Sequence, residues 1–130
     1  MEALTHIERS ARNGHMPPLL RRCEPETYRV VEGEVVFYVG EKTVSAGPGD
    51  VVVAPPDVPR TFRVGSAGAR WVVLTQVRSL ERFTDFGRAV SAPLAVPADG
   101  WPSLEERDAV AAMGAANGIE LLGPPGALPA

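Results

Sequence analysis

Several features that define large classes of proteins are scarce or missing in this sequence. The chain of 130 residues has one cysteine, Cys23, and therefore cannot form an internal disulfide. Charges or glycines interrupt every apolar stretch, so none reaches the length that crosses a membrane. Residues 1–6 have neither the basic start nor the apolar centre of a signal peptide. We therefore expect a cytoplasmic protein without a membrane partner.

Basic residues are also too few for a nucleic-acid surface. Lysine and arginine number 13 against 16 acidic residues, and the net charge is -3. Nucleic-acid binders carry a basic face, and the pair Arg21–Arg22 is a doublet rather than a patch. We expect no nucleic-acid partner.

The first part of the sequence consists of short alternating or valine-rich runs between glycine and proline turns. Such runs are typical of β-strands. Tyr28–Val39, with Gly33 at its centre, predicts a hairpin, and Arg60–Val64 and Arg70–Val77 predict two strands around residues 65–68. Other strands are expected at Leu4–Glu8, after Pro18, at Lys42–Ser45 and at Val51–Val53. About eight short strands without strand–helix alternation are typical of an all-β sandwich or jelly roll.

The hydrophobic period changes after Val77 and predicts helices. Apolar residues recur at helical spacing from Leu80 to Val90, and Ser103 followed by Glu106 is typical of a helix N-terminus. We expect two helices that pack on the outside of the barrel. The chain is thus predicted to be a single domain, with a barrel over about residues 1–77 and a helical tail over about 78–130.

Two glycine-centred blocks have an informative spacing. In the first, Glu26 precedes Gly33 by seven positions, and in the second, Gly49 leads through a valine run to Arg60. This spacing resembles that of the cupin family over roughly residues 17–77. The tail is similar to the ends of single-domain, quercetin-dioxygenase-like cupins. The resemblance implies a small double-stranded β-helix, the RmlC-like jelly-roll barrel.

The resemblance also implies a homodimer, in which N-terminal strands such as Leu4–Glu8 are exchanged between chains. Open strand edges favour the same association, because pairing across chains satisfies exposed backbone groups. We therefore expect a homodimer.

Cupins hold a divalent metal through three histidines and one glutamate, and the sequence departs from that pattern. Glu26 matches the glutamate, whereas Arg60 stands at the histidine of the second motif. Leu20 and Arg22, or Leu19 and Arg21 one residue earlier, stand at the two histidines of the first motif. Leucine donates nothing and a guanidinium repels a metal. We therefore expect no metal and no cofactor.

Other strong metal donors are few. His6, His15 and Cys23 are the candidates, and none has ligand spacing with Glu26. The histidines are interpreted as solvated or edge residues, and Cys23 as a core or loop residue.

Strand alternation predicts what fills the former metal position. Glu26 and Tyr28 share one face of a strand, and Arg60 and Phe62 share one face of another. In the cupin register both faces point inward, and Arg22 joins them. Glu26 then pairs with one arginine, and the other attracts a carboxylate, phenolate or phosphate. Alternatively, Arg22 lies in water at the barrel mouth and Glu26–Arg60 is a structural salt bridge.

The favoured function is the binding, or metal-free transformation, of a small anionic or aromatic molecule inside the barrel. Glu26 is the predicted anchor or general base, and the ligand-binding residues are predicted to be Arg22, Arg60, Tyr28, Phe62 and Leu20. One alternative is a metal-dependent dioxygenase of the quercetinase type with a different ligand set. Another is a non-enzymatic barrel acting as a sensor or interaction module. A wet pocket beside Glu26 favours the first hypothesis and a filled interior the last.

Overall fold

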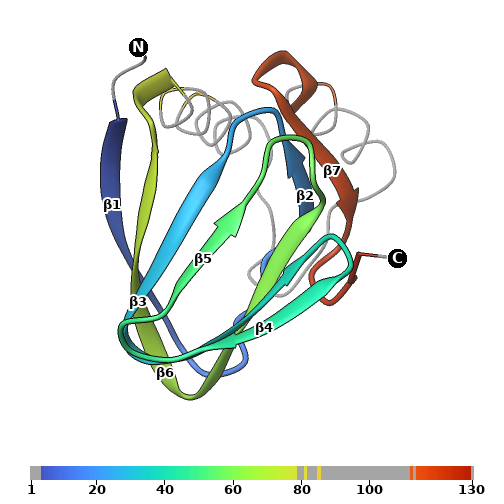
Figure 1. The fold of residues 1–130 in the computed structure, drawn as a ribbon. Helices are drawn as coiled ribbons and strands as arrows, with labels where there is room; N and C mark the ends of the chain where they lie inside the picture. Colours follow the sequence, from blue (N-terminus) through green and yellow to red (C-terminus); the bar gives the residue numbers. More distant parts are fainter. Residues whose placement is uncertain (1–3, 79–80, 82–84, 86–111, 113, 130) are drawn as a thin grey trace.

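The computed structural model describes residues 4–78, 81, 85, 112 and 114–129, which are almost entirely β-structure (Figure 1). The described strands form one antiparallel sheet that closes into a barrel, as predicted. They are β1 (Leu4–Ala11), β2 (Leu19–Arg22), β3 (Glu26–Val39), β4 (Lys42–Ala46), β5 (Val51–Ala54), β6 (Arg60–Gln76) and β7 (Ile119–Gly123). No helix among the described residues is long and apolar enough to cross a membrane.

Two long strands, β3 and β6, run through both layers of the barrel and pair with each other in each layer (Figure 1). In one layer the first half of β3 pairs with β5, and the second half of β6 pairs with β1. In the other layer the second half of β3 pairs with β4, and the start of β6 leads to β2 and then β7. Side chains from both layers therefore face one interior.

The hairpin predicted around Gly33 is wrong, because β3 continues through this glycine. The register with β6 shifts on both sides of it, at Val30/Glu32 and at Gly33/Val35, which marks a bulge. Gly33 has φ +75°, and a Cβ there would collide with the carbonyl oxygen of Gly68. A turn and a bulge both need a glycine in this conformation, so the local sequence does not separate them.

The break predicted at residues 65–68, between the strands Arg60–Val64 and Arg70–Val77, is also wrong, since residues 60–76 form the continuous strand β6. The bulges also change which residues point inward. Before Gly33 the buried apolar positions of β3 are Tyr28 and Val30, and after it they are Val35, Phe37 and Val39. The two-residue period therefore holds in each half and changes its phase at the bulge.

The chain returns to the barrel after its helical tail. Residues 77–78, 81 and 85 are helical, as are 112 and 114–116, whereas the rest of the predicted helices, including Leu80, Val90, Ser103 and Glu106, lies outside the described residues. The sequence predicts residues 119–123 as part of this tail. They instead form β7, which pairs with β2.

Candidate functional site

A cavity of about 380 Å³ lies inside the barrel. Such a volume falls within the range of small-molecule sites. Its walls come from β1, β2, β3 and β6 and from the segment between β1 and β2. The lining residues are Glu8, Arg9, Ser10, Ala11, His15, Pro17, Pro18, Leu20, Arg22, Glu26, Tyr28, Phe37, Val39, Arg60, Thr61, Phe62, Trp71 and Val73.

Three donors converge on the carboxylate of Glu26. Arg22 Nη1 donates to Oε2 at 3.1 Å, and Arg60 Nη1 donates to Oε1 at 3.1 Å. The Tyr28 hydroxyl donates to Oε1 at 3.0 Å. All four residues are buried, with Arg22 and Glu26 only 6% and 8% exposed. The structure thus brings together four of the residues that the sequence predicts for the site.

The backbone around Arg60 fixes its guanidinium. Nε donates to the carbonyl of Val58 at 3.2 Å, and Nη2 donates to that of Pro55 at 2.6 Å. Nη1 also lies 3.4 Å from the carbonyl of Glu24, in addition to its bond with Glu26. Four donor contacts to the protein leave Arg60 little capacity for a ligand. Arg60 therefore acts mainly to hold Glu26 and the loop before β6.

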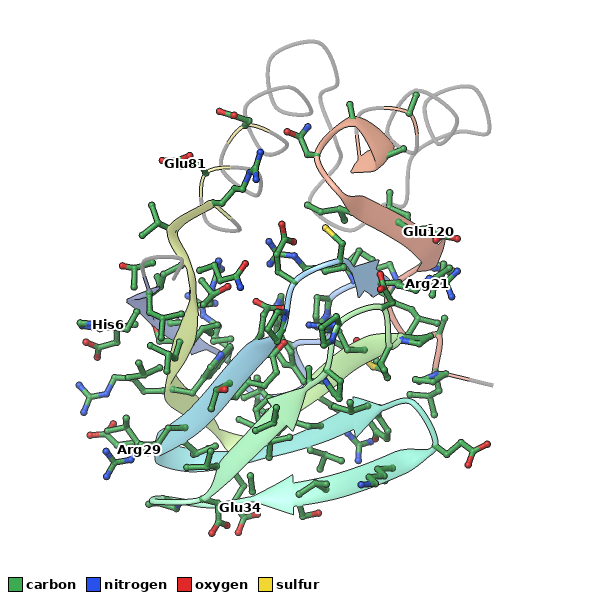
Figure 2. The ribbon with its side chains drawn as sticks, turned by 45° about the horizontal axis from the view of Figure 1, so that its top comes forward. His6, Arg21, Arg29, Glu34, Glu81 and Glu120 are labelled. Atoms are coloured by element: carbon green, nitrogen blue, oxygen red, sulfur yellow. The ribbon has the colours of Figure 1, made fainter. Side chains whose placement is uncertain are left out.

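The position of Arg22 follows from alternation along β2. Leu20 and Arg22 line the cavity, whereas Arg21 points outward. Arg21 forms an ion pair with Glu120 of β7, and the side chains of Arg21 and Glu120 lie side by side in Figure 2. Leu20 and Arg22, rather than Leu19 and Arg21, therefore stand at the two positions where the resemblance to cupins places the histidines of the first motif. Arg22 is buried, so it does not lie in water at a barrel mouth.

Tyr28 is held as a neutral phenol. Burial is the main cause that raises its pKa far above the ordinary value of 10.0, and the neighbouring Glu26 carboxylate raises it further. Its proton is donated to Glu26, so Tyr28 helps to fix the carboxylate.

The remaining walls are largely aromatic. The Tyr28 and Phe37 rings are stacked with centroids 4.9 Å apart, and Phe62 meets Trp71 edge to face at 5.0 Å. The ring of His15 lies 6.1 Å from that of Phe62, at the exposed end of this wall. Planar apolar groups of a ligand would find complementary surfaces here.

The lining of the cavity is positively charged. Three arginines and two glutamates contribute to it, a formal charge of +1 with His15 neutral. The whole chain carries -3. The carboxylate of Glu24, which is buried beside these residues without lining the cavity, balances this charge.

Sequence reasoning missed several residues of the site. Glu24 is buried beside the cluster, and its carbonyl accepts from Arg60. Glu8 and Arg9 on β1 reach the lining, and alternation alone did not identify which wall of the barrel β1 would form. His15, interpreted from the sequence as a solvated residue, lines the cavity while remaining exposed.

The residues at the expected metal position do not fit a divalent cation. The single carboxylate is already paired with two guanidinium groups, each 3.1 Å away, whose permanent charge opposes a metal. His6 lies on the outer surface (Figure 2), and Cys23 is exposed. Within the described part of the chain, no three His, Cys, Asp or Glu side chains gather where they could hold a metal ion.

Comparison with known proteins identifies the family. Residues 11–75, half of the chain, match the cupin domain, and the protein belongs to the cupin family. No curated protein matches the chain.

Solved structures share the fold. The TT1209 protein of Thermus thermophilus is 27% identical, with a TM-score of 0.53 over 58% of this chain and 74% of that one. The DMSP lyase DddQ of Ruegeria pomeroyi DSS-3 is 25% identical, with a TM-score of 0.54. The match covers 58% of this chain but only 39% of the lyase. An RmlC-like cupin of Shewanella frigidimarina NCIMB 400 is 19% identical, with a TM-score of 0.53 over 56% of this chain and 65% of that one, which shows the fold alone.

Proposed function

We propose that this cupin binds, and acts on, a small anionic or aromatic molecule inside the barrel without using a metal. The observation that carries the proposal is the buried Glu26 carboxylate, paired with Arg22 and Arg60 in a cavity with aromatic walls. The buried charges among the described residues are two guanidinium groups, of Arg22 and Arg60, and two carboxylates, of Glu24 and Glu26. An anionic group of the ligand would therefore be attracted by Arg22 itself and not by an excess of buried cations. The similarity to the DMSP lyase agrees with an activity on a small molecule.

Glu26 serves as an anchor rather than as a general base in this proposal. Both of its oxygens accept hydrogen bonds, and the donors include two guanidinium groups. Taking up a proton would weaken at least one of these charge-assisted bonds. Because Arg60 is committed to backbone carbonyls, the anionic group of the ligand is expected on the Arg22 side of the cluster.

The alternative functions fit the cavity less well. A sensor or interaction module with a degenerate barrel would have a filled interior, whereas a cavity of about 380 Å³ lies beside Glu26. A metal-dependent dioxygenase would need donors where Leu20, Arg22 and Arg60 stand. A homodimer and a cytoplasmic location remain predictions that accompany the proposal.

Calorimetric titration with benzoate and with cyclohexanecarboxylate tests the function. We expect both anions to bind and Arg22→Gln to weaken them about tenfold, more at low salt than at high. Arg21→Gln is the matched control, because this neighbour on β2 points away from the cavity, and its affinities should equal those of the wild type. Binding of neither anion, or equal losses in both variants, would contradict the proposal. Near-stoichiometric metal that Glu26→Ala removes would favour the dioxygenase instead.

A further inference from the structure

The outside of one layer of the barrel carries exposed aliphatic side chains. In this layer β5, β3, β6 and β1 lie side by side (Figure 1), and the register between them aligns outward-pointing residues in two rows. Leu74 of β6 is 41% exposed, and Val51 and Val53 of β5 are each 56% exposed. Exposed aliphatic side chains gathered on one face typically mark a contact with another protein. The two rows, which we call the outer sheet face, are Val53–Thr27–Leu74–His6 and Val51–Arg29–Val72–Glu8.

The outside of the other layer is more polar. Ser45 of β4 and Arg63 of β6 are aligned there on the two sides of β3. Leu122 of β7 is also exposed, at 36%, but it lies beside the ion pair that Glu120 forms with Arg21. Water solvates such a surface well, so a protein partner is expected on the outer sheet face instead.

The charges of this region favour a second copy of the chain as that partner. The Glu8 carboxylate lies 3.3 Å from Arg70, which also pairs with Glu32, so two carboxylates share one guanidinium. Arg29 points away from the barrel (Figure 2) and forms no ion pair with the described residues. A partner of one charge sign would repel either the carboxylates or Arg29, whereas a copy of the same surface brings both signs.

The register places these opposite charges symmetrically about β6. Arg29 and Glu8 flank Val72, one on each side of it. When two copies stack face to face about a twofold axis along β6, Val72 and Leu74 meet the same residues of the partner. Arg29 then faces the partner's Glu8, and Glu8 faces the partner's Arg29. Residues 51 and 53 lie beside the partner's edge strand β1.

We propose that the outer sheet face is a homodimer interface, in which two such layers stack face to face and form two reciprocal Arg29–Glu8 ion pairs. The proposal goes beyond the proposed function, because it concerns the outside of the barrel. It also differs from an exchange of N-terminal strands, since β1 stays paired with β6 of its own chain along its whole length.

Sedimentation velocity of the whole chain at about 1 to 100 µM tests the interface. We expect the wild type to have twice the chain mass of 13.8 kDa. Leu74→Glu sets two carboxylates against each other at the axis and should weaken dimerisation about a hundredfold. Leu122→Glu is the matched control, because it makes the same change at an exposed leucine outside the interface, and it should dimerise like the wild type. Circular dichroism checks that both variants are folded.

Charge reversal tests the register and does not depend on Leu74→Glu folding. Arg29→Glu and Glu8→Arg each set like charges against each other, so each variant alone should dimerise about tenfold more weakly than the wild type. In an equal mixture the two variants restore both pairs of opposite charges and should form a heterodimer about as tight as the wild-type dimer. A wild type that stays monomeric at about 100 µM, a dimer that survives Leu74→Glu, or a mixture no tighter than its components would overturn the proposal.

Discussion

Arg21 and Arg22 are neighbours on β2, and each pairs with one glutamate in a very different environment. Arg21 reaches Glu120 at 2.9 Å on the outer surface, where the two side chains are 37% and 57% exposed (Figure 2). Arg22 reaches Glu26 at 3.1 Å in the interior, where the side chains are 6% and 9% exposed. The distances are similar, so burial decides how much each pair affects stability and function.

The largest effect is expected on removing the centre of the buried cluster. Glu26→Ala leaves two buried guanidinium groups without their carboxylate and should lower the free energy of unfolding by about 3–5 kcal/mol. Arg60→Ala should also destabilise, but the double variant should lose less than the sum of the two single losses. Urea unfolding curves of the three variants measure this coupling.

The surface pair supplies the control for that cycle. Glu120→Ala makes the same chemical change on β7, where water solvates the arginine that remains, and its midpoint in urea should stay close to that of the wild type. Additive losses at Glu26 and Arg60, or equal losses at Glu26 and Glu120, would show that burial does not separate the two pairs.

An intermediate effect is expected at Tyr28, which hydrogen-bonds to the buried carboxylate. Tyr28→Phe should cost about 1–2 kcal/mol at neutral pH. Burial raises the pKa of Tyr28 far above 10.0, so above about pH 10 the tyrosine ionises in the unfolded chain while the folded chain keeps its proton. The free energy of unfolding should therefore fall with rising pH, and Tyr28→Phe should remove about 1.4 kcal/mol per pH unit of that slope.

Urea curves between pH 9 and 11 give this slope, and Tyr38→Phe, which removes a hydroxyl from the opposite face of β3, is the comparison. A slope that Tyr28→Phe leaves unchanged would mean that the phenol ionises as easily in the folded protein as in the unfolded chain.

The smallest effect is expected at the exposed pair. The hydrogen bond from Arg21 lowers the pKa of Glu120, so the pair stabilises the protein above the ordinary value of 4.5 and loses that contribution as pH falls through the lowered pKa. Glu120→Gln should remove this part of the acid dependence and change little at neutral pH. Thermal melting between pH 3 and 6 measures the difference, and an identical acid dependence in both proteins would contradict it.

The sequence predicted the class of fold because valine-rich runs between glycine turns indicate an all-β barrel. It failed where one local signal serves two structures. Gly33 at φ +75° is equally suited to a hairpin turn and to the bulge that it forms within β3, and contacts with Gly68 far along the chain decide between them. The strand Ile119–Gly123 is short and isolated, so its pairing with β2 could not be read from its own residues.

The site was predictable where alternation along one strand suffices. Alternation predicted that Glu26 and Tyr28 share one strand face and that Arg60 and Phe62 share another, and in the structure all four residues line the cavity. The burial of Arg22 was left open because it depends on tertiary partners, namely Glu26 on one side and β7 on the other. The unpartnered Nε1 of Trp71 is a property of the packed interior, which no local sequence pattern indicates.

The pairing of β2 has a consequence for the order in which the site is assembled during synthesis. The register between β2 and β6 is the single pair Leu20–Arg60, whereas β7 pairs with β2 along its whole length. During synthesis, Glu26, Arg60 and Trp71 therefore leave the ribosome well before β7, the strand that pairs with β2 and so positions Arg22. The anion binding that we propose is therefore expected to become possible only after β7 has been synthesised, even though the cluster of charges lies in the first half of the sequence.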